Sequence, residues 1–170
     1  MMGLDAVYPQ PNTSTSNPAH AVYPDLLRGL SIERSDQVWS TDITYIPMRK
    51  GFVYLAAVLD WATRRVLSWR LSNSMTTDFR IEAVEEAIRS HGTPGIFNTD
   101  QGSPFTSAEF VGLIQGHGIQ VSMDGKGRWV DNVWIERLWK SVKYEEVYRY
   151  SPNAGGFPRA FQERYGQLRH

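Results

Sequence analysis

Hydrophobic and polar residues alternate along the segment from Val38 to Ile46. One face carries Trp39, Thr41, Ile43 and Tyr45, and the other carries Val38, Ser40, Asp42, Thr44 and Ile46. This period of two residues predicts a β-strand. A continuous apolar run, Phe52 to Asp60, and a second alternating segment, Val66 to Leu71, follow after short polar breaks. The three segments together predict a meander of three consecutive strands.

The spacing of apolar residues becomes helical after the third predicted strand. From Thr76 to Ser90 apolar residues recur every three or four positions, and Gly92 and Pro94 follow where the helix should end. Ser107 can cap a second helix whose core face is apolar. A third helix is predicted from about Asp131 to Tyr148, again from apolar residues one turn apart.

Two short apolar segments between these helices, Ile96 to Thr99 and Ile119 to Ser122, have the length of strands. The predicted order is β-β-β-α-β-α-β-α, which places the chain in the α/β class. Residues 1–36 are rich in Pro, Ser, Asn and Thr and predict a linker-like lead, extended or disordered. Residues 37–148 form the predicted globular core, and 149–170 form an atypical tail without a clean period.

Composition and charge narrow the class of protein. The chain has 18 basic and 18 acidic side chains and no cysteine, which disfavours a disulfide scaffold, a thiolate metal site and secretion. The longest apolar run, Phe52 to Leu59, has eight residues, whereas a membrane span needs about 18, and no charged leader precedes an apolar segment. We therefore expect a cytoplasmic protein without a membrane partner. Because the net charge is zero, any binding to nucleic acid must depend on local groups.

Three acidic residues stand at positions where local structure alone does not require them. Asp42 interrupts a predicted strand, a place where Asp is depleted. Asp100 directly follows a short apolar strand, at the end where α/β folds bind ligands, and Glu136 lies near the start of the last helix. Taken singly, Asp100 is equally explained as a turn residue, Glu136 as a solvated helix position and Asp42 as a satisfied polar group. Taken together, they predict a shared site.

Converging carboxylates favour a divalent cation. Without one, the three charges repel, which raises their pKa values or drives the side chains apart. Mg²⁺ and Mn²⁺ prefer oxygen ligands, and two ions about 4 Å apart can support an in-line phosphoryl transfer. Zinc is disfavoured because the four histidines are scattered and lack H-x-x-x-H spacing. The residues therefore predict two Mg²⁺ or Mn²⁺ ions held by carboxylates.

Four segments carry a resemblance to a known family: WSTDITY at 39–45, LDWATR at 59–64, FNTDQGS at 97–103 and DNVWIERLWK at 131–140. They resemble the catalytic core of bacterial insertion-sequence transposases with a retroviral-integrase-type domain, over roughly Tyr23 to Tyr148. Thirty-five residues separate Asp100 from Glu136, the spacing of this Asp-Asp-Glu family. The resemblance implies a ribonuclease H-like mixed sheet in which Asp42, Asp100 and Glu136 ligate two Mg²⁺ ions. It also implies metal-dependent cleavage of a DNA strand and its transfer to target DNA.

Basic residues near the last helix are candidate DNA contacts. Lys140 and Lys143 lie one and two turns beyond Glu136 on nearly the same side, so they can hold phosphates. Lys126 and Arg128 lie in a Gly-rich loop just before that helix, which either orders on DNA or is simply a mobile connection. The expected DNA partners are transposon ends and a target, and a second copy of the chain or an intact transposase is an expected protein partner.

Two other functions stay open on the residues. Full-length relatives in this family carry an N-terminal helix-turn-helix region. After the catalytic helix they also carry a further helix and a basic segment, and residues 149–170 resemble neither this helix nor this basic segment. The first alternative is therefore an inactive truncated remnant that at most binds DNA or a transposase. The second is a nuclease of the same fold, which would cut DNA without joining its 3′ ends to a target.

Overall fold

The computed structural model describes residues 23–47, 51–100, 107–124 and 133–141. Its elements are β1 (Val38–Pro47), β2 (Phe52–Asp60), β3 (Val66–Ser72), α1 (Asp78–His91), β4 (Ile96–Thr99), α2 (Ala108–Gly116), β5 (Gln120–Met123) and α3 (Val133–Ser141). This is the predicted order, and the ends of the five strands and of α1 lie within two residues of the predicted ones. The hydrophobic period therefore identified the order of the elements correctly. Residues 1–22 of the predicted lead, residues 142–148 of the third predicted helix and the predicted tail at 149–170 lie outside the described residues.

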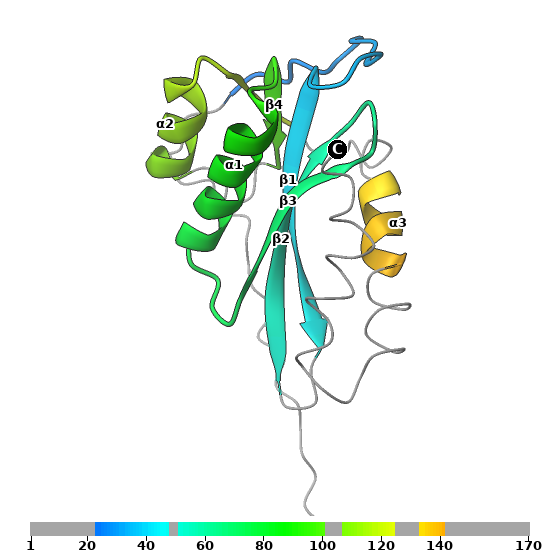
Figure 1. The fold of residues 1–170 in the computed structure, drawn as a ribbon. Coiled ribbons are helices and arrows are strands. Elements are labelled where there is room, and N and C mark those ends of the chain that lie inside the picture. The colour runs from blue at the N-terminus through cyan, green and yellow to red at the C-terminus, as the bar shows by residue number, and fades with distance from the viewer. Residues whose placement is uncertain (1–22, 48–50, 101–106, 125–132, 142–170) are drawn as a thin grey trace, which may run out of the picture.

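The five strands form one mixed sheet in the order β3-β2-β1-β4-β5 (Figure 1). Strands β1, β2 and β3 are antiparallel neighbours, which confirms the predicted meander. Strands β4 and β5 instead run parallel to β1, because each is reached through a helical connection rather than a tight hairpin. Strand β1 thus lies between an antiparallel and a parallel neighbour, in the middle of the sheet.

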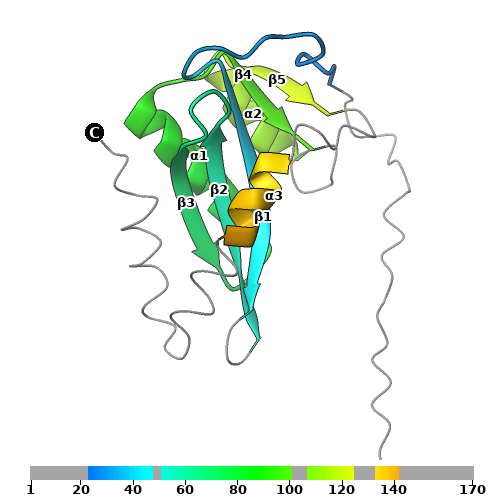
Figure 2. The same cartoon turned by 90° about the vertical axis from the view of Figure 1, so that its right-hand side faces the viewer.

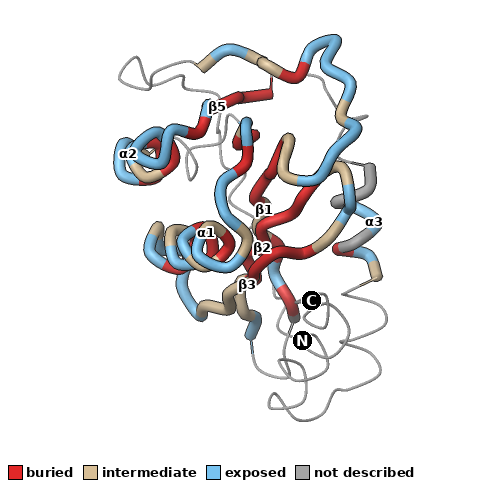
Figure 3. The backbone as a smooth tube through the Cα atoms, turned by 45° about the horizontal axis from the view of Figure 1, so that its top comes forward, coloured by how far each residue is buried: buried red, intermediate tan, exposed pale blue. Residues whose placement is uncertain are grey.

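Helices cover both faces of the sheet. Figures 1 and 2 show α1 and α2 on one face and α3 on the other, across β1. A first hydrophobic cluster, with Trp39, Phe97 and Phe110, fills the space under α1 and α2. A second cluster, with Ile46 and Trp139, lies on the face covered by α3. The alternation along β1 explains both clusters, because its two faces are buried against different helices, and much of β1 and β2 is buried accordingly (Figure 3).

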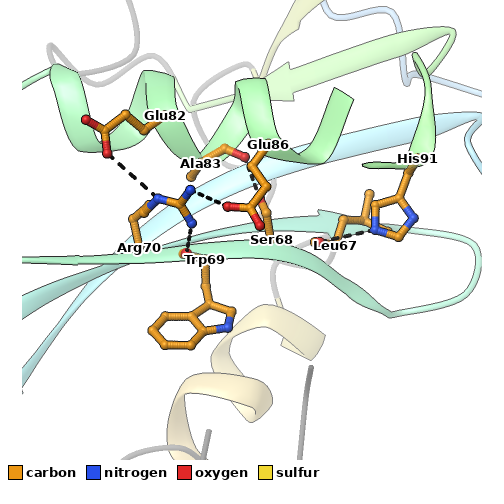
Figure 4. Close-up of polar contacts among 8 residues, drawn as sticks. All are labelled: Leu67, Ser68, Trp69, Arg70, Glu82, Ala83, Glu86 and His91. Atoms are coloured by element: carbon orange, nitrogen blue, oxygen red, sulfur yellow. Dashed lines mark hydrogen bonds and ion pairs between the residues drawn. The ribbon is translucent and has the colours of Figure 1, made fainter. Parts of the chain in front are cut away.

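Polar contacts hold α1 against the outer strand β3 (Figure 4). The guanidinium of Arg70 lies 3.7 Å from the carboxylate of Glu82 and forms a closer ion pair with Glu86. The hydroxyl of Ser68 donates to the carbonyl of Ala83 at 2.5 Å. These contacts neutralise Arg70 within the fold, so its charge is used to attach a helix.

The start of α2 follows the predicted capping pattern. Ser107 has extended backbone geometry, and its hydroxyl accepts a hydrogen bond from the Phe110 N–H at 3.2 Å. Phe110, Val111 and Ile114 form the buried face of the helix, as their spacing predicts. Within the described ranges, no helix has both the length and the apolar character needed to cross a membrane.

The end of the predicted lead contacts the sheet. Residues 23–36 contain turns and bends but no helix or strand. The carbonyl of Pro24 accepts a hydrogen bond from the Met123 N–H at 3.2 Å, and the Leu26 N–H donates to the Ser122 hydroxyl at 3.0 Å. The Leu27 side chain is buried. Residues 24–26 of the predicted lead therefore lie along β5.

Candidate active site

Asp42 lies in the middle of β1 with its carboxylate on the face covered by α3. Its neighbour in the antiparallel register is Ala57 of β2, a small residue that leaves room for the acidic side chain. Both carboxylate oxygens accept hydrogen bonds: Oδ1 from the Ile43 N–H at 2.8 Å, and Oδ2 from the indole N–H of Trp139 at 2.6 Å. The partly buried carboxylate is thus held in one orientation.

Asp100 directly follows β4, and its side chain is exposed. Strands β1 and β4 are parallel, with Ser40 opposite Asn98. Asp42 lies two residues beyond Ser40 in β1, and Asp100 lies two residues beyond Asn98, just after the end of β4, so the register places the two residues side by side. Ligand sites of α/β sheets lie at such carboxyl ends of parallel strands.

Glu136 lies in the first turn of α3 and is exposed. One turn further along, Trp139 is buried in the second cluster. The same side chain donates to Asp42, so α3 is attached to β1 at the position of the first carboxylate. This attachment brings Glu136 toward the edge of the sheet that carries Asp42 and Asp100.

The pKa of Asp42 depends on the charges of both other carboxylates. Burial raises the pKa of Asp42 most strongly, and the negative charges of Asp100 and Glu136 raise it further. The hydrogen bonds from Trp139 and from the Ile43 N–H act in the opposite direction by stabilising the ionised form, but the net pKa shift is upward. Asp100 and Glu136 therefore each lie near enough to Asp42 for their charges to act on its carboxylate.

The three carboxylates are chemically suited to a hard divalent cation, but their side chains are not grouped around a common point. Asp42, Asp100 and Glu136 offer carboxylate oxygens, the ligands that Mg²⁺ and Mn²⁺ prefer, and their mutual repulsion is what a cation would relieve. Among the residues that the structure describes, no three His, Asp or Glu side chains are grouped tightly enough to hold an ion. Full convergence of the three carboxylates therefore stays a prediction.

A buried polar pair beside Asp100 was not singled out in the sequence. Asp124 directly follows β5 and is 9% exposed, and its carboxylate accepts a hydrogen bond from the Asn98 side-chain amide at 3.0 Å. The Asp124 N–H also donates to the carbonyl of Thr99 at 3.2 Å. Together these bonds join the ends of β4 and β5 next to Asp100. Asp124 directly follows an apolar strand, as Asp100 does. This position is the sequence signal that could have revealed Asp124.

Of the four predicted DNA contacts, the structure describes one. Lys140 lies in the last turn of α3 with an exposed side chain, on the helix that carries Glu136. Lys126, Arg128 and Lys143 lie outside the described residues. An exposed ammonium on the helix that carries Glu136 is available to a phosphate, so Lys140 remains a candidate contact.

Comparison with known proteins gives one family model and several relatives. Residues 32–128 match the model of the integrase core domain. The transposase for insertion sequence element IS904 of Lactococcus lactis subsp. lactis is 36% identical over 114 residues, which cover 66% of this chain and 45% of that transposase. Transposase InsF for insertion sequence IS3A of Escherichia coli is 33% identical over 115 residues, which cover 66% of this chain and 40% of InsF. The chain thus spans less than half the length of these relatives.

Two solved structures share the fold. One is a chain of the simian T-cell lymphotropic virus intasome in complex with PP2A regulatory subunit B56 gamma, with a TM-score of 0.66, 22% identity, and coverage of 86% of this chain and 53% of that one. The other is the HTLV-2 integrase catalytic core domain in complex with magnesium, with a TM-score of 0.61, 23% identity, and coverage of 75% and 85%. At this level of identity the likeness concerns the fold, which is the ribonuclease H-like α/β fold expected from the sequence.

Proposed function

The chain belongs to the integrase core domain family, and from this premise we propose that it is the catalytic core of an insertion-sequence transposase. The proposed reaction is cleavage of a DNA strand followed by its transfer to target DNA. The observation that supports the proposal most is the electrostatic proximity of Asp42, Asp100 and Glu136, which come from a strand, a strand end and a helix. A stable fold gains nothing from three such charges unless a cation or a substrate uses them.

The proposed cofactor is a pair of divalent ions, Mg²⁺ or Mn²⁺, held by Asp42, Asp100 and Glu136. The donor chemistry favours these metals, and the HTLV-2 integrase core was solved with magnesium. When bound, the ions would supply positive charge to offset the charge that develops on a phosphate during transfer. Asp42 is the proposed shared ligand, because the charges of both other carboxylates act on it and both of its oxygens are held in place by hydrogen bonds.

The DNA partners in this proposal are transposon ends and a target duplex. In the first step water attacks a phosphodiester, which breaks the bond to the 3′ oxygen and leaves a free 3′ hydroxyl. In the second step that hydroxyl attacks a phosphodiester of the target, forming a new bond and releasing a target 3′ hydroxyl. The proposed role of Lys140 is to hold a backbone phosphate beside the carboxylates, since phosphate contacts set position without reading sequence.

The test of the proposed function is a strand-transfer assay. The chain is incubated with Mn²⁺, a supercoiled plasmid and a labelled duplex that carries a recessed 3′ hydroxyl, and both nicking and joining of label to plasmid are measured. We expect both activities in the native sequence and neither in an Asp100→Asn variant that remains folded. Nicking without joining would indicate a nuclease instead. DNA binding without either activity would indicate an inactive DNA-binding protein and would refute the proposal.

A further inference from the structure

We infer that Trp139 is a positioning residue that orients Asp42 for metal binding. Its indole N–H donates to Oδ2 of Asp42 at 2.6 Å, across 97 positions of the sequence. Hydrogen bonds to an ionised acceptor are shorter and stronger than those between neutral groups. This inference rests on the proposed function, because it concerns a residue that acts through a proposed ligand.

The surroundings of the indole ring define where its N–H can point. The Trp139 side chain is 7% exposed and packs in the second cluster, which also contains Ile46 and Leu59. Ile46 and Asp42 lie on the same face of β1, because they are four positions apart in a strand. A large rigid ring held in this cluster has little freedom, so its polar end is directed at the carboxylate.

The same side chain also influences the second proposed ligand. Glu136 precedes Trp139 by three positions in α3, and residues three apart lie on the same side of a helix. The depth at which the indole packs therefore sets how closely Glu136 approaches the sheet, while the N–H sets the orientation of Asp42. One residue thus couples the docking of α3 to the geometry of two of the three carboxylates.

Replacing Trp139 by Phe separates these two effects. Phe retains an aromatic ring for the cluster but has no N–H, so the Oδ2 atom of Asp42 loses its donor. Partners that hold a metal ligand in place typically contribute 10–100-fold to metal affinity. We therefore expect Trp139→Phe to weaken Mn²⁺ binding by about tenfold or more.

Trp39→Phe is a closely matched control. Trp39 is fully buried in the first cluster, on the opposite face of the sheet, and its indole N–H donates to the carboxylate of Asp36 at 2.9 Å. The control thus removes the same kind of hydrogen bond from the same kind of residue. We expect it to lose stability but to bind Mn²⁺ as the native sequence does.

The first measurement is isothermal titration of the full chain with Mn²⁺ for the native sequence and both variants, with circular dichroism to verify folding. A selective loss of affinity in Trp139→Phe supports the inference. Equal affinities in the native sequence and Trp139→Phe, or equal losses in Trp139→Phe and Trp39→Phe, would overturn it. Failure of the native sequence to bind Mn²⁺ would instead count against the proposed function.

A second measurement needs no metal. The indole N–H signals of the six tryptophans are recorded by NMR in EDTA, and the Trp139 signal is assigned by its disappearance in Trp139→Phe. Replacing Asp42 by Ala removes the acceptor, so the Trp139 signal should move upfield and its N–H should exchange faster with water. A Trp139 signal that is unaffected by Asp42→Ala would show that the indole does not hold this carboxylate. This outcome would overturn the inference independently of the Mn²⁺ titration.

Discussion

Adding a divalent ion to the metal-free chain should raise its free energy of unfolding, because only the folded state places the charges of Asp100 and Glu136 near the carboxylate of Asp42. Each of the other two charges raises the pKa of Asp42, and burial raises it further. The metal-free protein therefore holds an ionised carboxylate in an unfavourable environment at neutral pH. A cation that binds this arrangement and not the unfolded chain stabilises the fold by mass action.

The size of the effect follows from the affinity and from the length of the chain. At a free metal concentration one hundred times the Kd, the gain is about 2.7 kcal/mol. For a chain of 170 residues, about 1 kcal/mol corresponds to roughly 2–4 °C in Tm. We therefore expect saturating Mn²⁺ to raise Tm by about 5–11 °C.

The contribution of Asp42 to the free energy of unfolding depends on pH, and the sign of this dependence follows from the direction of its pKa shift. Because the pKa of Asp42 is raised in the folded state, the unfolded chain loses this proton first as pH rises from the ordinary value of 3.8. The folded state then binds more protons, so the contribution of Asp42 to stability falls as pH rises through its raised pKa. In EDTA, Asp42→Asn should therefore be at least as stable as the native sequence at neutral pH. The stabilisation by Mn²⁺ should grow over the same interval, since the metal binds the ionised carboxylate.

Thermal unfolding with EDTA or Mn²⁺ measures these effects directly. The triple variant Asp42→Asn, Asp100→Asn, Glu136→Gln should lose the metal-dependent shift. Glu109→Gln, which removes an exposed carboxylate from the first turn of α2, should keep it. An unchanged midpoint in the native sequence at saturating Mn²⁺, or an equal shift in the triple variant, would refute the reasoning.

Three further predictions concern DNA binding and the fold. Replacing both Lys140 and Lys143 by Ala should flatten the salt dependence of log K by about 1.8, since each phosphate contact contributes about 0.9, without changing sequence preference. Fluorescence anisotropy on matched and scrambled duplexes checks this, and an unaltered slope would place the DNA on another surface. Ser107→Ala should cost about 1 kcal/mol in urea unfolding, because the Phe110 N–H loses its cap; an unchanged free energy of unfolding would contradict this. Phe97→Ala should cost about 3–5 kcal/mol in the same assay, because the Phe97 side chain is fully buried, and a much smaller loss would mean that the core collapses around the site.

Periodicity predicted the elements because each depends on short-range geometry. The alternation from Val38 to Ile46 specified both the strand and its two faces, and the structure buries Trp39 and Ile46 in separate clusters. Ser107 was predicted as a helix cap because a cap acts on an N–H only three residues away. The ribonuclease H-like identity of the fold came from the resemblance of whole motifs, and the comparisons with solved structures agree with it.

The carboxylates were found in the sequence for a different reason. Asp42 and Asp100 conflict with, or terminate, apolar strands, and such conflicts are visible locally. Their position relative to Glu136 is not visible in this way. It depends on the parallel pairing of β1 with β4 and on the docking of α3, which involve residues far apart in the chain.

Packing between distant segments settled the contacts that no local pattern encodes. The indole N–H of Trp139 reaches Asp42 only because α3 packs the Trp139 side chain onto β1 and β2. Likewise, Asp124 meets Asn98 because β4 and β5 lie side by side in parallel register. Such contacts bring together residues 26 and 97 positions apart. Their geometry depends on the assembled sheet and helices, whereas hydrophobic period and capping depend only on neighbouring residues.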